Sequence, residues 1–269
     1  MIGFFDSGLG GLTVLKEVEK LLPQYSYLYL GDNARTPYGS RSQDTIYEFT
    51  AECVQELFTR GAELIVLACN TASSSALRKI QQVFLPKYYP DKRVLGILIP
   101  MAEEAPRLSR TKHIGVLATE ATVAARAYII EIGKVDPQVV VFQQACPLLV
   151  PIIELEGLEW EGLDLILKKY VSQLLRQNDR IDSIILGCTH YAILKSRVEK
   201  LAGPEVRVIS QGPLIAEKLR NYLDRHPEIE AKLEEKSRRS FLTTESSERT
   251  KHLARLFFDS PITLESISL

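Results

Sequence analysis

The stretch Ser183-Ile184-Ile185-Leu186-Gly187-Cys188-Thr189-His190-Tyr191 decides the fold of this chain. Apolar residues followed by a glycine and then polar side chains are typical of a buried parallel strand that ends at a turn into a helix. Open α/β sheets bind ligands at the carboxyl ends of their strands. We therefore expect Cys188 to lie in a functional site, with His190 close enough to tune its thiol.

The same pattern occurs at Leu64-Ile65-Val66-Leu67-Ala68-Cys69-Asn70-Thr71, where an apolar run again ends in a small residue, a cysteine, a polar residue and a threonine. A weaker repeat relates residues 2–7 to residues 114–119, at an offset of 112 (Gly115 minus Gly3). Such self-similarity indicates an α/β protein with two similar domains. We expect mainly parallel sheets, a pseudo-two-fold axis between the domains, and an active site in the cleft between them.

Composition narrows the class of protein. The 269 residues suffice for two ordinary domains, and the formal net charge of −1 gives no basic field for nucleic acid. No apolar run approaches the roughly 20 residues that span a bilayer, and the chain enters an apolar strand without a basic leader. We expect a cytoplasmic protein with no membrane partner. The four cysteines and four histidines lack the spacing of disulfide frameworks or zinc sites, so no metal is expected.

A glycine-rich turn, Asp6-Ser7-Gly8-Leu9-Gly10-Gly11, follows the first expected strand and precedes a helix over residues 12–22. Backbone N–H groups and the helix dipole make such a turn suited to anions. It resembles half of a dinucleotide-binding fingerprint, with Asp32 as the ribose-binding acid, but Thr13 replaces the third glycine. That alternative leaves both cysteines unused. A tight turn with no ligand is the other alternative.

The rest of the chain alternates strands and helices. A strand over residues 27–30 runs into a polar loop that contains Pro37-Tyr38-Gly39, and loops at strand ends often bear function. Further strands are expected at residues 94–99, 139–142, 206–209, 241–244 and 262–267. Helices are expected at residues 44–60, 71–85, 160–176, 192–201, 211–223, 226–239 and 246–258, with a short one beginning at residue 100. We expect residues 1–95 and 208–269 to form the first α/β domain, and residues 96–207 the second.

Two cysteines at equivalent strand ends restrict the chemistry. One activated cysteine with a histidine would suit acyl transfer, as in an amidase or glutaminase. A second cysteine is surplus there, but it is needed when a proton leaves one face of a carbon and another arrives on the opposite face. The alternative is that Cys69 and Cys188 are buried packing residues and that His190 only caps a helix.

Several blocks of sequence resemble the signature blocks of the bacterial glutamate racemase family. They are Asp6-Ser7-Gly8-x-Gly10-Gly11, Gly31-Asp32-x-Ala34-Arg35-x-Pro37-Tyr38-Gly39, Cys69-Asn70-Thr71-Ala72-Ser73, Thr119…Thr122-Val123…Ala127-Tyr128, Cys146-Pro147-Leu148-Leu149-Val150-Pro151…Glu154 and Gly187-Cys188-Thr189-His190-Tyr191. The resemblance spans nearly the whole chain. The sequence departs from these blocks at Asn33, at Thr36 and at Thr244-Glu245-Ser246. It also departs at Ala125, where the family often has serine, and at Ala192, where the family usually has proline.

The resemblance implies a cofactor-independent isomerase that interconverts L- and D-glutamate and supplies D-glutamate for peptidoglycan, and hence for cell-wall biogenesis and cell shape. Cys69 would take the proton from the D-isomer and Cys188 from the L-isomer. Asp6 would tune Cys69, His190 would tune Cys188, and Glu154 would orient His190. A homodimer is expected at the level of the family.

Glutamate brings two carboxylates and an ammonium, and hydroxyl, amide and backbone N–H donors could hold these without lysine or arginine. The site should close and exclude water so that these donors act at full strength. The expected substrate-binding set is Asp6, Ser7, Pro37, Tyr38, Gly39, Asn70, Thr71, Thr119, Thr122, Thr189 and His190.

Two other functions fit the same residues. An aspartate racemase of the same superfamily would share the chemistry, and a non-catalytic dicarboxylate-binding protein would leave both cysteines inert. A pyridoxal-phosphate racemase is disfavoured, since no lysine lies at an expected strand end near the cleft.

Overall fold

The computed structural model describes all 269 residues and contains two separate parallel sheets. The first has six strands in the order β10-β9-β2-β1-β3-β4, and the second has four in the order β6-β5-β7-β8. The strands of the first sheet are β1 (Ile2–Asp6), β2 (Tyr27–Gly31), β3 (Leu64–Leu67), β4 (Arg93–Gly96), β9 (Arg239–Thr243) and β10 (Leu264–Ser266). Those of the second are β5 (His113–Ala118), β6 (Val140–Ala145), β7 (Ser183–Gly187) and β8 (Arg207–Ile209).

The second sheet repeats part of the first. The order β2-β1-β3-β4 recurs as β6-β5-β7-β8, with every pairing parallel. β3 leads to Cys69 and β7 leads to Cys188, so the two cysteines follow equivalent strands. The predicted α/β fold with two similar halves is confirmed.

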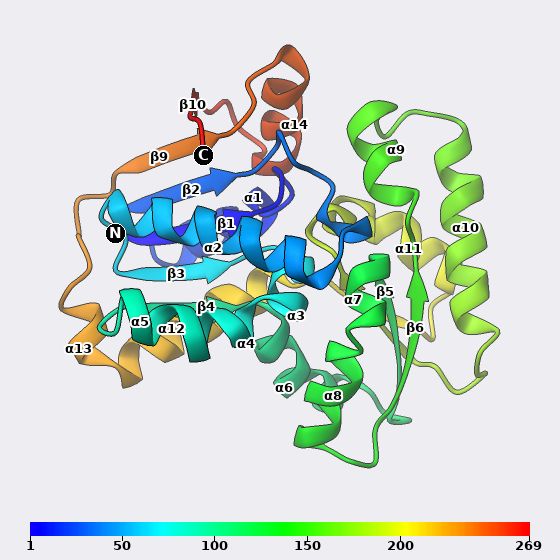
Figure 1. Cartoon of the computed structure of the whole chain (residues 1–269). Helices are drawn as coiled ribbons and strands as arrows, with labels where there is room; N and C mark the ends of the chain where they lie inside the picture. Colours follow the sequence, from blue (N-terminus) through cyan, green and yellow to red (C-terminus); the bar gives the residue numbers. More distant parts are fainter.

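Helices cover both faces of each sheet, which explains why β1, β2, β3 and β7 are buried along their whole length. Helix α1 packs on one face of the first sheet and α2 on the other, as Figure 1 shows. The helices are α1 (Leu12–Leu21), α2 (Gln43–Thr59), α3 (Asn70–Ser75), α4 (Leu77–Lys79), α5 (Leu85–Tyr88), α6 (Leu98–Leu108), α7 (Glu120–Ala124), α8 (Ala127–Val135), α9 (Leu149–Leu155), α10 (Gly162–Leu175), α11 (Lys195–Ala202), α12 (Gly212–Arg225), α13 (Pro227–Glu230) and α14 (Glu248–Phe258). Shorter turns are η1 (Tyr38–Ser40), the π-helical η2 (Ile80–Phe84) and η3 (Thr189–Leu194).

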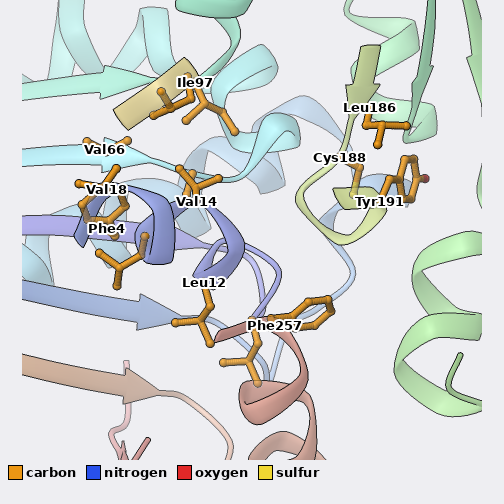
Figure 2. Packing of buried hydrophobic residues seen from close by; sticks show 14 of the residues in the cluster. Phe4, Leu12, Val14, Val18, Val66, Ile97, Leu186, Cys188, Tyr191 and Phe257 are labelled. Atoms are coloured by element: carbon orange, nitrogen blue, oxygen red, sulfur yellow. The ribbon is translucent and has the colours of Figure 1, made fainter. Parts of the chain in front are cut away.

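One apolar cluster joins the two halves. It runs from Phe4 in the first sheet through Leu12 of α1 and Phe257 of α14 to Leu186 and Tyr191 beside the second sheet (Figure 2). Because this cluster is continuous, the carboxyl ends of the two sheets are held facing each other by packing as well as by the connecting chain.

The predicted helix over residues 71–85 is wrong as a single element. The segment is divided into α3, α4, η2 and α5, and the π-helical turn η2 changes the helical register in its middle. A π turn inserts an extra residue, which the spacing of apolar residues does not reveal.

The predicted solvated helix over residues 226–239 is also wrong. Only α13 forms, because the chain then turns back to the first sheet, where the backbone N–H of Ser26 donates to the carbonyl of Glu234 at 2.8 Å. The strand predicted to reach residue 99 ends at Gly96, since α6 begins at Leu98.

The predicted domain boundaries stay a prediction. β9 and β10 complete the first sheet, and the boundary between residues 207 and 208 falls within β8 of the second. No helix in the structure has the length and apolar character needed to cross a membrane.

Candidate active site

A cleft lies where the carboxyl ends of the two sheets meet. It is lined by the segments that follow β1, β2, β3, β5, β6 and β7, namely Ser7, Thr36, Pro37, Tyr38, Gly39, Ser40, Cys69, Asn70, Thr71, Thr119, Glu120, Cys146, Pro147, Val150, Pro151, Cys188, Thr189 and His190. Its volume of about 50 Å³ exceeds the roughly 10–15 Å³ that one ordered water requires. The cleft is therefore small but has room for a few waters. Its lining contains no lysine or arginine.

The structure brings Cys69 and Cys188 into this one cleft, both buried. Cys69 is the N-cap of α3, where its Sγ donates to Ser7 Oγ at 3.4 Å and accepts from the backbone N–H of Ala72 at 3.4 Å. Cys188 Sγ lies 4.0 Å from His190 Nδ1. Each sulfur thus has its own polar neighbours, supplied by a different half of the chain.

The surroundings of Cys69 favour its protonated form. Burial, followed by the nearby Asp6 carboxylate, raises the pKa of the Cys69 thiol to about 12. Asp6 itself is fully buried and accepts from the N–H of Gly8 at 3.0 Å and from Thr189 Oγ1 at 3.3 Å. Burial raises the pKa of Asp6 as well, against the opposing charge of His190. Burial therefore raises the pKa of both Asp6 and Cys69.

The surroundings of Cys188 favour a positive imidazole. Burial opposes the charge on His190, but its hydrogen bonds to Cys188 and Glu154 outweigh burial, so the pKa of His190 lies well above its ordinary value. His190 Nε2 is 2.8 Å from Glu154 Oε1, and the Phe257 ring meets the imidazole edge-on at 5.0 Å. The charged imidazole is thus held beside the Cys188 sulfur by a carboxylate and an aromatic ring.

Gly10 explains how His190 fits so closely against the glycine-rich turn. A Cβ at Gly10 would lie 2.5 Å from His190 Nδ1 and 2.5 Å from Thr189 Oγ1. Only a glycine leaves room there, so this glycine of the turn brings the two halves into contact rather than serving a dinucleotide.

Hydroxyl and amide groups make up most of the remaining polar lining. Thr71 Oγ1 and Thr119 Oγ1 are 2.9 Å apart, which joins the segment after β3 to the segment after β5. Thr122 is fully buried behind them and accepts from Thr119 Oγ1 at 3.0 Å. Of the predicted site residues, Thr122, Asp6 and Glu154 lie behind the surface of the cleft, and all the others line it.

The loop after β2 presents its backbone to the cleft. The Tyr38 side chain is buried and its hydroxyl donates to Asp32, so the ring faces away from a ligand. Gly39 lies against Thr119, where an added Cβ would come within 2.8 Å of the threonine Cβ. Asp32 is fully buried and also accepts from Arg35 Nε at 2.6 Å. It anchors this loop and is not available to a ribose.

Sequence reasoning missed two polar residues behind the cleft. Gln211 and Tyr128 form a buried hydrogen-bonded group with Asn70. Gln211 follows the last strand of the second sheet, so its position at a strand end was a usable signal. The sequence also did not predict that the segment after β6, from Cys146 to Pro151, lines the cleft.

Comparison with known proteins identifies the family. The Asp/Glu/hydantoin racemase family model matches residues 11–219. This chain belongs to the Asp/Glu/hydantoin racemase family. The glutamate racemase of Paracoccus denitrificans (strain Pd 1222) is 42% identical to this family member, over 98% of the chain and 99% of the relative. The resemblance to glutamate racemases is thereby confirmed.

Solved structures agree with this family assignment. The structure is similar to glutamate racemase isoform RacE1 from Bacillus anthracis, with a TM-score of 0.90 and 31% identity over 100% of this chain and 97% of that one. It is also similar to the glutamate racemase from Francisella tularensis subsp. tularensis SCHU S4 in complex with D-glutamate, with a TM-score of 0.87 and 31% identity over 99% and 97%.

Proposed function

We propose that this racemase-family protein interconverts L- and D-glutamate without a cofactor, by proton transfer at Cα between Cys69 and Cys188. The observation that supports this most directly is that two cysteines from equivalent strands line one cleft. The substrate is proposed from relatives named glutamate racemase that are 39–42% identical over most of the chain.

In the proposed mechanism the Cys188 thiolate removes the Cα proton of L-glutamate, and the Cys69 thiol delivers its proton to the opposite face. The reverse reaction exchanges the two roles. His190, held by Glu154, lies beside the Cys188 sulfur, whereas burial and Asp6 raise the pKa of Cys69 to about 12.

Substrate carboxylates would be held by uncharged donors. The proposed donors are Ser7, Asn70, Thr71, Thr119 and Thr189, together with backbone N–H groups of the loop at Pro37-Tyr38-Gly39. In a small cleft with few waters, each such bond to a carboxylate is stronger than it would be in solvent.

The test is the circular dichroism of pure L-glutamate with no added cofactor, for the wild type and for Cys69→Ser and Cys188→Ser. Decay of the signal to zero with the wild type, and no decay with either variant, supports the two-cysteine racemase. Decay of the L-aspartate signal alone would show that the substrate is aspartate and that the protein is an aspartate racemase. If the circular-dichroism signals of both amino acids stay unchanged, the proposal is refuted in favour of a dicarboxylate-binding protein.

We further propose a cytoplasmic homodimer that supplies D-glutamate to peptidoglycan synthesis, as the resemblance of its sequence blocks to glutamate racemases implies. Growth of a D-glutamate auxotroph that expresses this chain tests the physiological role. Sedimentation at several protein concentrations tests the assembly.

A further inference from the structure

Gln211, at the junction between β8 and α12, is almost fully buried together with Asn70 and Tyr128. Asn70 Nδ2 donates to Gln211 Oε1 at 2.7 Å, and Gln211 Nε2 donates to Asn70 Oδ1 at 2.9 Å. The two side-chain amides thus form a doubly hydrogen-bonded pair. Tyr128 closes the group, because its hydroxyl donates to Asn70 Oδ1 at 2.8 Å and accepts from Gln211 Nε2 at 2.8 Å.

The hydrogen bonds of the Asn70 side-chain amide show which of its groups is still free to bind a ligand. Its oxygen accepts two hydrogen bonds and is saturated, and one of its two N–H groups is used by Gln211. One N–H group of Asn70 is left, and Asn70 lines the cleft beside Cys69. A free amide side chain could turn over and present its oxygen instead, which would repel a carboxylate.

The three residues come from different parts of the fold. Asn70 begins α3 after the first sheet's β3, Tyr128 lies in α8 beside the second sheet, and Gln211 precedes α12, which packs against α1. The group therefore fixes the Asn70 amide relative to both halves of the cleft at once. Buried polar groups that are fully satisfied in this way specify one arrangement of their surroundings.

We infer that Gln211 is a positioning residue that holds the Asn70 amide with one N–H group directed at a carboxylate of the substrate. This inference rests on the proposed function, because it takes glutamate as the ligand of the cleft. Gln211 does not line the cleft, so it acts through Asn70.

The first test is Gln211→Met, which keeps the length of the side chain and removes its hydrogen bonds. Loss of the alignment of this N–H group should weaken its hydrogen bond to the substrate carboxylate and raise KM for glutamate about tenfold, which is about 1.4 kcal/mol. We expect kcat to change by less than about threefold. The matched control is Gln177→Met, which removes the bond from an exposed glutamine to the Gln143 carbonyl at 3.1 Å; neither residue lines the cleft. Its KM should equal that of the wild type.

Two further variants separate positioning from folding. Gln211→Glu has nearly the same shape, but its carboxylate cannot donate to Asn70 Oδ1. Its KM should therefore be raised at neutral pH and should recover as the pH falls and the new side chain becomes protonated. In an Asn70→Ala background, Gln211→Met should add less than about a twofold effect on KM, since two residues that act as one unit are not additive.

The outcomes distinguish the inference from the proposed function. Wild-type protein that leaves glutamate unchanged refutes both. Active wild type with an unchanged KM in Gln211→Met refutes the positioning role alone. So does a full effect of Gln211→Met in the Asn70→Ala background, or a KM in Gln211→Glu that does not respond to pH.

Discussion

Replacement of Gly10 by alanine tests how closely His190 must be held. The added Cβ would lie 2.5 Å from His190 Nδ1, about 1 Å inside the ordinary contact distance of roughly 3.5 Å. His190 cannot move away without disturbing its 2.8 Å bond to Glu154 or its edge contact with Phe257. Overpacking of this kind costs about 1–3 kcal/mol of stability. A displacement of about 1 Å at a reacting group can lower the rate about 100-fold.

We therefore expect Gly10→Ala to fold with a lower Tm and to lose about 100-fold in kcat/KM for glutamate. Circular dichroism from each enantiomer measures the rate. Because the enantiomers have equal free energy, kcat/KM must fall by the same factor in both directions.

Gly133→Ala is the matched control, since Gly133 lies in α8 and an added Cβ there meets no atom within 4 Å. It should keep full activity and gain about 0.5–1 kcal/mol from helix propensity. Activity of Gly10→Ala within about threefold of the wild type would refute the argument that this contact sets the position of His190.

Three other predictions concern the cysteines, the ion pair and the core. Iodoacetamide at about pH 8 should label Cys69 more slowly than Cys188, because burial and Asp6 raise the pKa of Cys69 to about 12 and only the thiolate is alkylated. Peptide mass spectrometry that finds Cys69 labelled first would contradict this reasoning. Burial opposes the charge on His190 and Glu154 favours it, so Glu154→Gln should lower the pKa of His190 in NMR titration. The stability from protonated His190 is fully present below its unfolded pKa of about 6.5 and is lost as pH rises through the raised folded value. In Glu154→Gln the loss should be complete at a lower pH and should be smaller in total, whereas an unchanged titration would show that Cys188 alone raises the pKa. Phe257→Ala empties a fully buried site and should cost about 3–5 kcal/mol in urea unfolding; a cost below about 1 kcal/mol would mean that α14 repacks freely.

The arrangement of strands was largely predictable because the central strands β1, β3, β5 and β7 are short, mainly apolar runs. The strand ends at Cys69 and Cys188 could be located for the same reason, since a glycine or alanine and then polar residues follow each run. The irregular helices after Asn70 were not predictable, because the π-helical turn η2, which lies against α2 and β4, has no signature in the local spacing of apolar residues.

The candidate site was predictable where residues follow a strand directly, and less so where a contact depends on distant chain. His190 and Glu154 are 36 residues apart, and their 2.8 Å bond was expected from the family resemblance alone. The contact between Asn70 and Gln211 spans 141 residues and has no local signature. The close contact between Gly10 and His190 likewise depends on how the two halves pack against each other.

The position of β9 has a consequence for synthesis on the ribosome. β9 pairs with β2, from Tyr27 beside Arg239 to Gly31 beside Thr243, although more than two hundred residues separate them in the chain. All four strands of the second sheet lie within residues 113–209 and emerge before β9 does. The second half can therefore complete its sheet while the outer edge of β2 still lacks its neighbour. An unpaired strand edge is a template for pairing with other chains, so nascent chains that stop short of β9 should be the aggregation-prone species of this protein.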